Sequence, residues 1–220
     1  LYLRRFKQMN FIFNKDLGFD TEQVMLVENP YAFVNEQKSV ALREQVRRYT
    51  ATQASFTGMT GAGTKYGRSN MNGHIINGKR EYIKEYRVDF DFFEFNKIPI
   101  VKGRSFSRDF PIDTIRQDFP AEKLDSTSSR TMMNIVVNET LYNMLGKPPL
   151  GEINRSMGSI IVGVCRDYIY DALFTNSGPM YHACQPKNSS YFWLKVAKGE
   201  NITAVTDKMK NEWAKMTGNE

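Results

Sequence analysis

The chain has 220 residues, of which 41% are hydrophobic and 25% charged, and its formal net charge is +6 at pH 7. These values are ordinary for a folded globular protein and exclude a chain that is disordered throughout. The 30 basic and 24 acidic residues are interspersed without a long run of one sign, so we expect a mixed solvated surface and no nucleic-acid interface. Two cysteines and two histidines without C-x-x-C spacing provide no metal-binding motif.

The first segment predicts an amphipathic helix over residues 1–15. Apolar residues recur there at spacings of three and four, basic residues occupy the other face, and Gly18 is a suitable end. Two interpretations stay open: a stalk that continues from a preceding membrane span, or an ordinary helix docked on the domain. The longest strongly apolar stretch is far shorter than the roughly 20 residues that a membrane helix needs, so no span is expected within the chain.

The next segment predicts a βαβ-like unit. Val24–Val27 reads as a strand, Asn35–Tyr49 as a helix with Asn35 as its N-cap, and residues 50–57 as a second strand. The glycine-rich stretch Gly58–Gly67 follows. It lacks the Lys-Ser/Thr pair of a phosphate loop and the helix that a dinucleotide fingerprint requires, so we expect a crossing between subdomains and no nucleotide site.

The middle of the chain is strand-rich. Asn77-Gly78 suits a type I′ turn and predicts a hairpin of Gly73–Ile76 with Glu81–Val88. Further elements are expected as follows: a helical turn at Asp89–Asn96, strands at Ile98–Val101 and Met133–Val137, a long polar excursion at 107–130, and a helix at Asn138–Leu145 that Asn138 caps and Gly146 ends.

The last third predicts three strands and a helix. Ser159–Cys165 is the best candidate for a buried strand, with alternate residues facing the core, and Met180–Cys184 and Tyr191–Ala197 follow. Residues 201–216 have the periodicity of an amphipathic helix. Arg166 and Asp167 invite a catalytic interpretation, but no histidine or nucleophile lies nearby in sequence, so we expect a surface pair.

Six segments, in this order, resemble the periplasmic core domain of MacB-like permeases of the FtsX superfamily of ABC transporters, especially the type common in Bacteroidetes. They are Asn14–Pro30, Tyr86–Ser107, Asn134–Glu152, Ile160–Leu173, the Gly178-Pro179 turn with the strand after it, and the closing helix with Trp213. The resemblance extends over nearly the whole chain.

The resemblance implies an α+β fold in two lobes. Residues 1–17 would be a stalk helix continuing from a membrane span. Residues 18–57 and 159–220 would form a porter-like βαβ lobe from both chain ends, and residues 58–158 a small β-rich lobe inserted between them.

The resemblance also implies a function without bond chemistry or a cofactor. The domain would lie in the periplasm, anchored to the bacterial inner membrane. It would transmit movement from a cytoplasmic ATPase subunit, through the permease's membrane helices, to an exported substrate or to a periplasmic adaptor or lipoprotein. The full-length permease would pair as a homodimer. The main rival is a ligand-binding or sensor domain of a membrane receptor, which should present a deep pocket with convergent polar groups; a soluble hydrolase is a third alternative.

The cysteines depart from the pattern of the family, in which a small apolar residue is typical at the position of Cys165; Cys165 and Cys184 lie on predicted strands that could be neighbours. In a periplasm they could form a disulfide, worth about 3 kcal/mol in the chain-entropy model; the alternative is two separate buried thiols. Recognition of a substrate or partner would lie on loops, for which the candidates are residues 58–67, 108–130 and 174–179.

Overall fold

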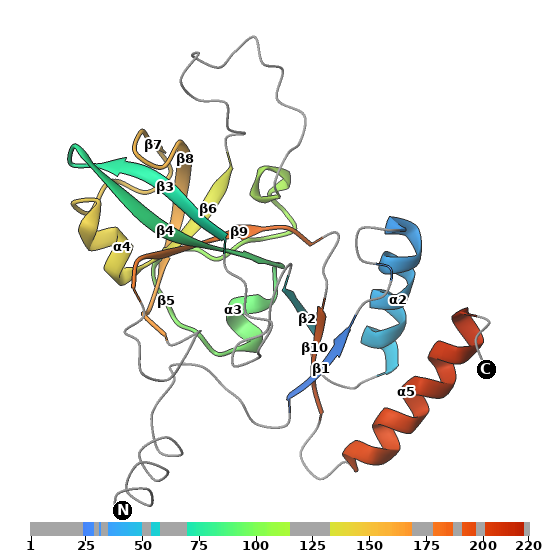
Figure 1. Cartoon of the computed structure of the whole chain (residues 1–220). Coiled ribbons are helices and arrows are strands. Elements are labelled where there is room, and N and C mark those ends of the chain that lie inside the picture. Colours follow the sequence, from blue (N-terminus) through green and yellow to red (C-terminus); the bar gives the residue numbers. More distant parts are fainter. Residues whose placement is uncertain are drawn as a thin grey trace, which may run out of the picture.

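A computed structural model describes residues 24–28, 31, 35–49, 54–57, 70–114, 133–168, 178–186, 191–196 and 201–217. Within these residues the chain forms one strongly curled sheet in the order β1-β10-β2-β4-β9-β6-β8-β5, with β3 paired to β4 and β7 paired to β8 (Figure 1). Most neighbours are antiparallel, and the β4–β9 and β6–β8 pairs are parallel. The fold class is α+β, as the sequence predicted.

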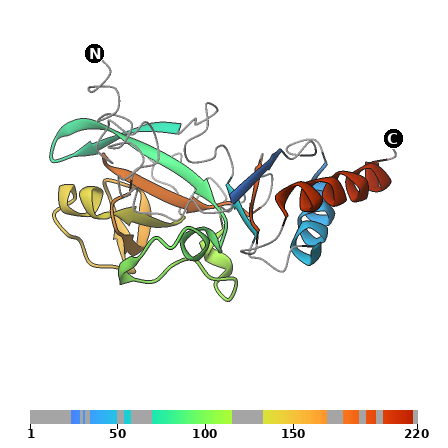
Figure 2. The ribbon, with the colours of Figure 1, turned by 90° about the horizontal axis from the view of Figure 1, so that it is seen from below.

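One end of the sheet is a split βαβ unit. Strands β1 (Val24–Glu28) and β2 (Ala54–Thr57) are joined by helix α2 (Glu36–Tyr49), and both pair antiparallel with β10 (Tyr191–Lys195), which lies between them. Helix α5 (Ile202–Thr217) lies at the same end, beside α2 (Figures 1 and 2). The first and last described elements therefore lie at the same end of the molecule (Figures 1 and 2), and the predicted βαβ-like unit is confirmed.

The larger part of the sheet is built from the chain between these elements. Its strands are β3 (Asn70–Ile76), β4 (Lys79–Val88), β5 (Ile100–Gly103), β6 (Asn134–Asn138), β7 (Ile153–Asn154), β8 (Ser159–Cys165) and β9 (Met180–Cys184). Short helices α3 (Phe92–Phe95) and α4 (Glu139–Met144) cover opposite faces. Phe92 packs in a core with Tyr86 and Val136, whereas Leu141 packs with Ile83 and Ile135. Each face of β4, β9, β6 and β8 thus has its own apolar core.

Local sequence signals placed several elements correctly. Asn77 and Gly78 have φ angles of 52° and 76°, as a type I′ turn requires, and they join β3 to β4. Asn35 accepts a hydrogen bond from the backbone N–H of Lys38 and caps α2, and Asn138 caps α4 in the same way through Leu141. The described strands and α-helices begin and end within a few residues of the predicted bounds, whereas the short β7 and the 3₁₀ turn Pro111–Asp113 were not anticipated.

Strand β8 differs from the expected alternation. Ile161 and Val164 belong to the α4-side core, and Val162 and Cys165 to the α3-side core. A β-bulge causes this change of face, because Ile161 pairs with Ile135 while Gly163, two residues on, pairs with the next residue of β6. The prediction that alternate residues of this strand share one face was wrong at this point.

The pairing of β8 and β9 bears on the proposed lobes. Both strands flank β6 and belong to the larger part of the sheet, so the pairing favours a boundary after β9 in place of one at residue 159. The division into residues 18–57 with 159–220 and residues 58–158 stays a prediction, and the predicted helix over residues 1–17 lies outside the described residues.

Candidate functional site

A cluster of polar groups joins the end of β6 to the start of β9. Asn138 is fully buried, and its Oδ1 accepts hydrogen bonds from the N–H groups of Leu141 and Met180, both at 3.0 Å. Its Nδ2 donates to Asp167 Oδ1 at 2.6 Å and to the carbonyl of Gly178 at 2.8 Å. One amide therefore uses its full hydrogen-bonding capacity to hold α4, the end of β8 and the start of β9 together.

Asp167 is part of this cluster, and the expected surface pair with Arg166 was only half correct. Arg166 is exposed, but Asp167 is half-buried and accepts hydrogen bonds from the Thr140 N–H at 3.1 Å and hydroxyl at 2.6 Å, besides the bond from Asn138. Its carboxylate thus binds the first turn of α4, where a negative charge is favourable. Asp167 positions backbone and offers no evident catalytic geometry.

A second polar cluster surrounds Asp113, in the 3₁₀ turn Pro111–Asp113. The Arg104 guanidinium binds both oxygens of this buried carboxylate, at 2.6 and 2.9 Å. The Ser107 N–H and the Asn134 amide donate to it as well, at 2.9 and 2.6 Å. Burial alone would raise the pKa of Asp113, but these donors outweigh burial and lower it.

The Asp113 cluster was not anticipated, because residues 107–130 read as one polar excursion. Its first part is instead fixed to the sheet: Arg104 brings Asp113 against β5, and Thr114 makes an isolated parallel bridge with Cys184 of β9. The stretch that follows Gly103, RSFSRDFPID, mixes charged, small and aromatic residues and does not have the periodicity of a helix. The one sequence signal is Arg104, which directly follows the strand-ending Gly103 and so lies where its guanidinium would need a carboxylate partner.

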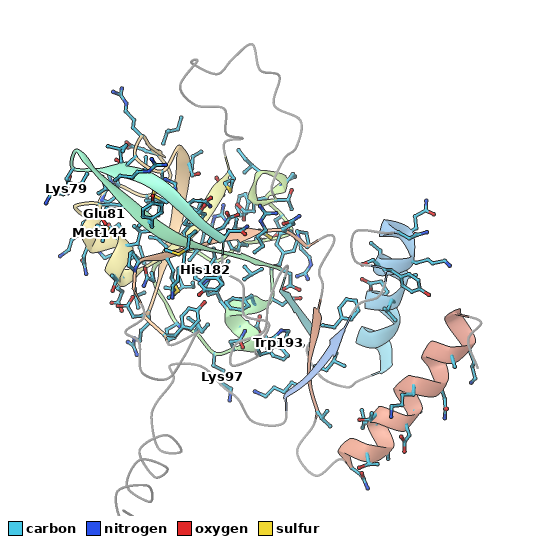
Figure 3. The ribbon with its side chains drawn as sticks, in the orientation of Figure 1. Lys79, Glu81, Lys97, Met144, His182 and Trp193 are labelled. Atoms are coloured by element: carbon cyan, nitrogen blue, oxygen red, sulfur yellow. The ribbon has the colours of Figure 1, made fainter. Side chains whose placement is uncertain are left out.

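His182 lies at the centre of the α3-side core (Figure 3). Its ring is 4.9 Å from that of Phe93, between centroids, and stacks on those of Tyr86 and Tyr168. Nδ1 is 3.2 Å from the Val136 carbonyl and so carries the proton, while Nε2 accepts from the Tyr168 hydroxyl at 2.6 Å. Burial lowers the pKa of His182 to about 4, against the smaller opposing effect of the Val136 carbonyl. The imidazole is a neutral structural group, enclosed by protein.

This buried imidazole predicts a measurable loss of stability in mild acid. The unfolded chain binds a proton at His182 below about pH 6.5, whereas the folded chain does not until about pH 4. The contribution of neutral His182 to the free energy of unfolding is therefore complete above about pH 6.5 and declines as the pH falls from 6.5 towards 4. We expect urea unfolding to show a loss of about 2 kcal/mol between pH 7 and pH 5 from this residue, and His182→Gln to lack it. Equal pH dependence of the two proteins would contradict the assignment.

Both cysteines lie in the part of the chain that the structure describes, and each is a free thiol there. Cys165 and Cys184 are buried and unbonded. The strands that carry them are not neighbours, because β6 lies between β8 and β9; Cys165 pairs with Asn138 at one end of β6, and Ala183, next to Cys184, pairs with Ile135 near the other. This arrangement of the strands favours the alternative of two separate buried thiols. Burial raises the pKa of both thiols, which makes them poor nucleophiles.

An open pocket of about 540 Å³ lies between α3 and residues 105–109. Its polar side chains are largely engaged with one another. Arg108 binds both oxygens of Asp91 at 2.7 Å, an interaction that raises the pKa of Arg108, and the Ser107 hydroxyl bonds Asp109. Arg108, Asp91, Ser107 and Asp109 are thus paired with one another, whereas the buried hydroxyl of Ser105, which also lines the pocket, has no hydrogen-bond partner among the described residues.

The rest of the described chain adds no catalytic arrangement. No group of three His, Cys, Asp or Glu side chains among the described residues is placed to hold a metal ion, and none of the helices in that part is long and apolar enough to cross a membrane. The candidate recognition segments fall mainly outside it: residues 58–67, 115–130 and 174–177 are not described.

Among known proteins, solved structures resemble this chain, whereas sequence comparisons find no match. No protein-family model and no curated protein sequence matches the chain. The periplasmic region of MacB from Actinobacillus actinomycetemcomitans superimposes with a TM-score of 0.55 at 12% identity, over 94% of this chain and 89% of that one. This chain has the fold of the MacB periplasmic region. The extracellular domain of the ABC-type transporter YknZ from Gram-positive bacteria also matches, with a TM-score of 0.52 at 10% identity over 90% of this chain and 96% of that one.

The MacB fold confirms the family resemblance seen in the sequence, as far as architecture is concerned. Both matches extend over almost the whole of both chains, so the likeness includes the split βαβ unit and the larger sheet together. Identities of 10–12% show the shape of the molecule and leave its activity to be argued separately.

Proposed function

We propose that this chain is the extracytoplasmic domain of an ABC-transporter permease and that it performs no bond chemistry. The observation that carries the proposal is the near end-to-end match to the MacB periplasmic region, which covers 94% of this chain. The described polar clusters agree with it, because Asn138, Asp167 and Asp113 bind the protein's own backbone and side chains. A protein that transmits movement needs such rigid connections and no reactive group.

In this proposal the domain is anchored in the bacterial inner membrane and faces the periplasm. A cytoplasmic ATPase subunit drives the permease's membrane helices, and the domain passes their movement to a periplasmic adaptor, a lipoprotein or the exported substrate. The first and last described elements, β1 and α5, belong to the same end of the molecule (Figures 1 and 2). Two permeases would act as a homodimer.

The location is testable with a single exposed cysteine. Lys79 is exposed at the tip of the β3–β4 hairpin (Figure 3), so Lys79→Cys in the full-length protein should react with a membrane-impermeant maleimide in intact spheroplasts. The native protein is the matched control, since buried Cys165 and Cys184 should react only after denaturation. Labelling of Lys79→Cys only after lysis would refute an extracytoplasmic position.

The transmission step needs the transporter itself. Full-length protein should co-purify with an ATPase subunit, and trapping that ATPase with nucleotide should change amide hydrogen exchange in this domain. Unchanged exchange in every nucleotide state would contradict transmission. A receptor that senses a ligand would instead change its exchange on adding a small molecule, without an ATPase.

A further inference from the structure

The β3–β4 hairpin presents an exposed apolar face. Met71, Ile75 and Tyr82 are 59%, 60% and 57% exposed. They share one face, because Gly73 pairs with Tyr82 and residues two apart on a strand point the same way. The opposite face of the hairpin, with Ile76 and Ile83, is buried in the α4-side core. The exposed side chains continue the α3-side face of the sheet beyond the part that α3 covers.

Strand β3 is also an edge that lacks the usual protection. Within the described residues it pairs with β4 alone. The two-residue turn fixes Ile76 and Lys79 as a hydrogen-bonded pair, so the N–H and C=O groups of Met71, Gly73 and Ile75 point away from β4. Natural edge strands are normally guarded by a charge, a proline or a bulge. The sequence of β3, NMNGHII, contains neither a charged residue nor a proline, and its register with β4 is unbroken.

A cation lies over the middle of this edge strand. A Cβ atom placed on Gly73 would be 2.9 Å from Arg80 Nε and 3.3 Å from its NH2 group, so the guanidinium rests on the backbone of Gly73. The same guanidinium is 5.7 Å from the centre of the Tyr82 ring. Arg80 is exposed, and no carboxylate of the described residues forms an ion pair with it. A glycine at this position lets the arginine reach the edge where a further strand would begin.

We propose that the edge of β3 binds an extended acidic segment of a partner protein, which adds to the sheet as one more strand. Backbone groups of Met71, Gly73 and Ile75 would supply the hydrogen bonds, as in other cases of β-strand addition. The residue opposite Gly73 would be Asp or Glu, bound by Arg80, and its neighbours two positions away would be apolar, against Met71 and Ile75. The expected motif is apolar-x-acidic-x-apolar.

The proposal names the kind of partner that the proposed function leaves open and in that sense rests on it. The binding measurement, however, uses the 220-residue chain without membrane or ATPase. Failure of peptide binding would leave the location experiment with Lys79→Cys untouched, and failure of that labelling would leave a binding result standing. The two ideas can therefore fail separately.

The probe is a short peptide with valine, glutamate and valine at alternate positions and threonine between them, titrated by calorimetry or NMR. Arg80→Glu should weaken binding at least about fivefold, since an exposed ion pair is exchanged for a repulsion. A peptide with lysine in place of glutamate should bind more tightly to Arg80→Glu than to the native protein. A peptide with N-methylated backbone amides should not bind, because it cannot form the strand hydrogen bonds.

Substitutions on the strand supply the remaining controls. Met71→Lys places a charge on the edge strand, which disfavours the addition of a further strand, and should abolish binding. Ile153→Lys, at a 54% exposed position on β7, should not change it. The proposal would be overturned if neither Arg80→Glu nor Met71→Lys changed the affinity for the peptide, or if no peptide bound at all. So would self-association of the chain that Met71→Lys abolishes, or a denaturation midpoint lowered by Met71→Lys more than by Ile153→Lys, because these results would show β3 covered by a second copy or by the chain itself.

Discussion

Replacing Gly163 with alanine is expected to destabilise the fold by about 3 kcal/mol or more. A Cβ atom at this position would be 2.1 Å from the backbone carbonyl oxygen of Arg104 and 3.1 Å from its carbonyl carbon. Real Cβ atoms essentially never approach so closely, and the obstacle is main chain, which cannot rotate away. Strand β5 would have to separate from β8, where Gly103 faces Gly163 and the Arg104 N–H bonds the Val162 carbonyl at 3.0 Å.

Urea unfolding of Gly163→Ala measures this effect, and Gly146→Ala is the matched control. Gly146 follows α4 with φ of 77° and has open space around the added methyl group, so its substitution should cost only about 1 kcal/mol of backbone strain. The same strand shift in Gly163→Ala would draw Arg104 away from Asp113. If Gly163→Ala were no less stable than Gly146→Ala, the close approach of β5 and β8 would be wrong.

The sequence predicted those elements whose signals are local. Asn77-Gly78 sets the β3–β4 turn through its own φ angles, and Asn138 caps the helix that begins at the next residue. The two-residue spacing of apolar residues places a strand in the chain, but it does not say which strand lies beside it. The insertion of β6 between β8 and β9 separates Cys165 from Cys184, and no feature of either cysteine segment indicates that.

The polar clusters escaped prediction for the same reason. Asp167 finds its partners 27 and 29 residues earlier, at Thr140 and Asn138, and Asp113 finds Asn134 21 residues later. A carboxylate in a polar stretch reads as a surface residue until its partners are known. The bulge at Gly163 is equally hidden, because the apolar run of β8 is compatible with regular alternation on a strand that is buried on both faces.

The two clusters have a common place in the fold. The Asn138 cluster holds Asp167 and Gly178, which flank residues 169–177, and the Asp113 cluster together with the Thr114 bridge holds the chain just before residue 115. Both adjoin segments proposed for recognition. The proposed function would require such segments to be held at their ends, and these buried hydrogen bonds hold the chain next to both of them.

Replacing Asn138 with alanine should therefore be the most damaging polar substitution in the larger part of the sheet. It would leave the N–H groups of Leu141 and Met180 and the carbonyl of Gly178 without their buried partner, and Asp167 without one donor. The expected loss is about 3–5 kcal/mol, measured by urea unfolding. Asn143, exposed on α4, is the control, and its alanine variant should stay within about 0.5 kcal/mol of the native protein.

Asn138→Asp separates the role of the side-chain oxygen, which accepts hydrogen bonds, from that of the side-chain NH2 group, which donates them. The new carboxylate still accepts from Leu141 and Met180, so the cap of α4 and the start of β9 are kept. It cannot donate to Asp167, and two carboxylates would then face each other at the 2.6 Å now bridged by a hydrogen bond. We expect Asn138→Asp to have a lower free energy of unfolding than the native protein, and the difference to become smaller as the pH falls. The reason is that protonation of one of the two carboxyl groups restores a hydrogen-bond donor. A pH-independent deficit equal to that of Asn138→Ala would show instead that Asp167 is not held by this residue, and the ends of segment 169–177 would need another anchor.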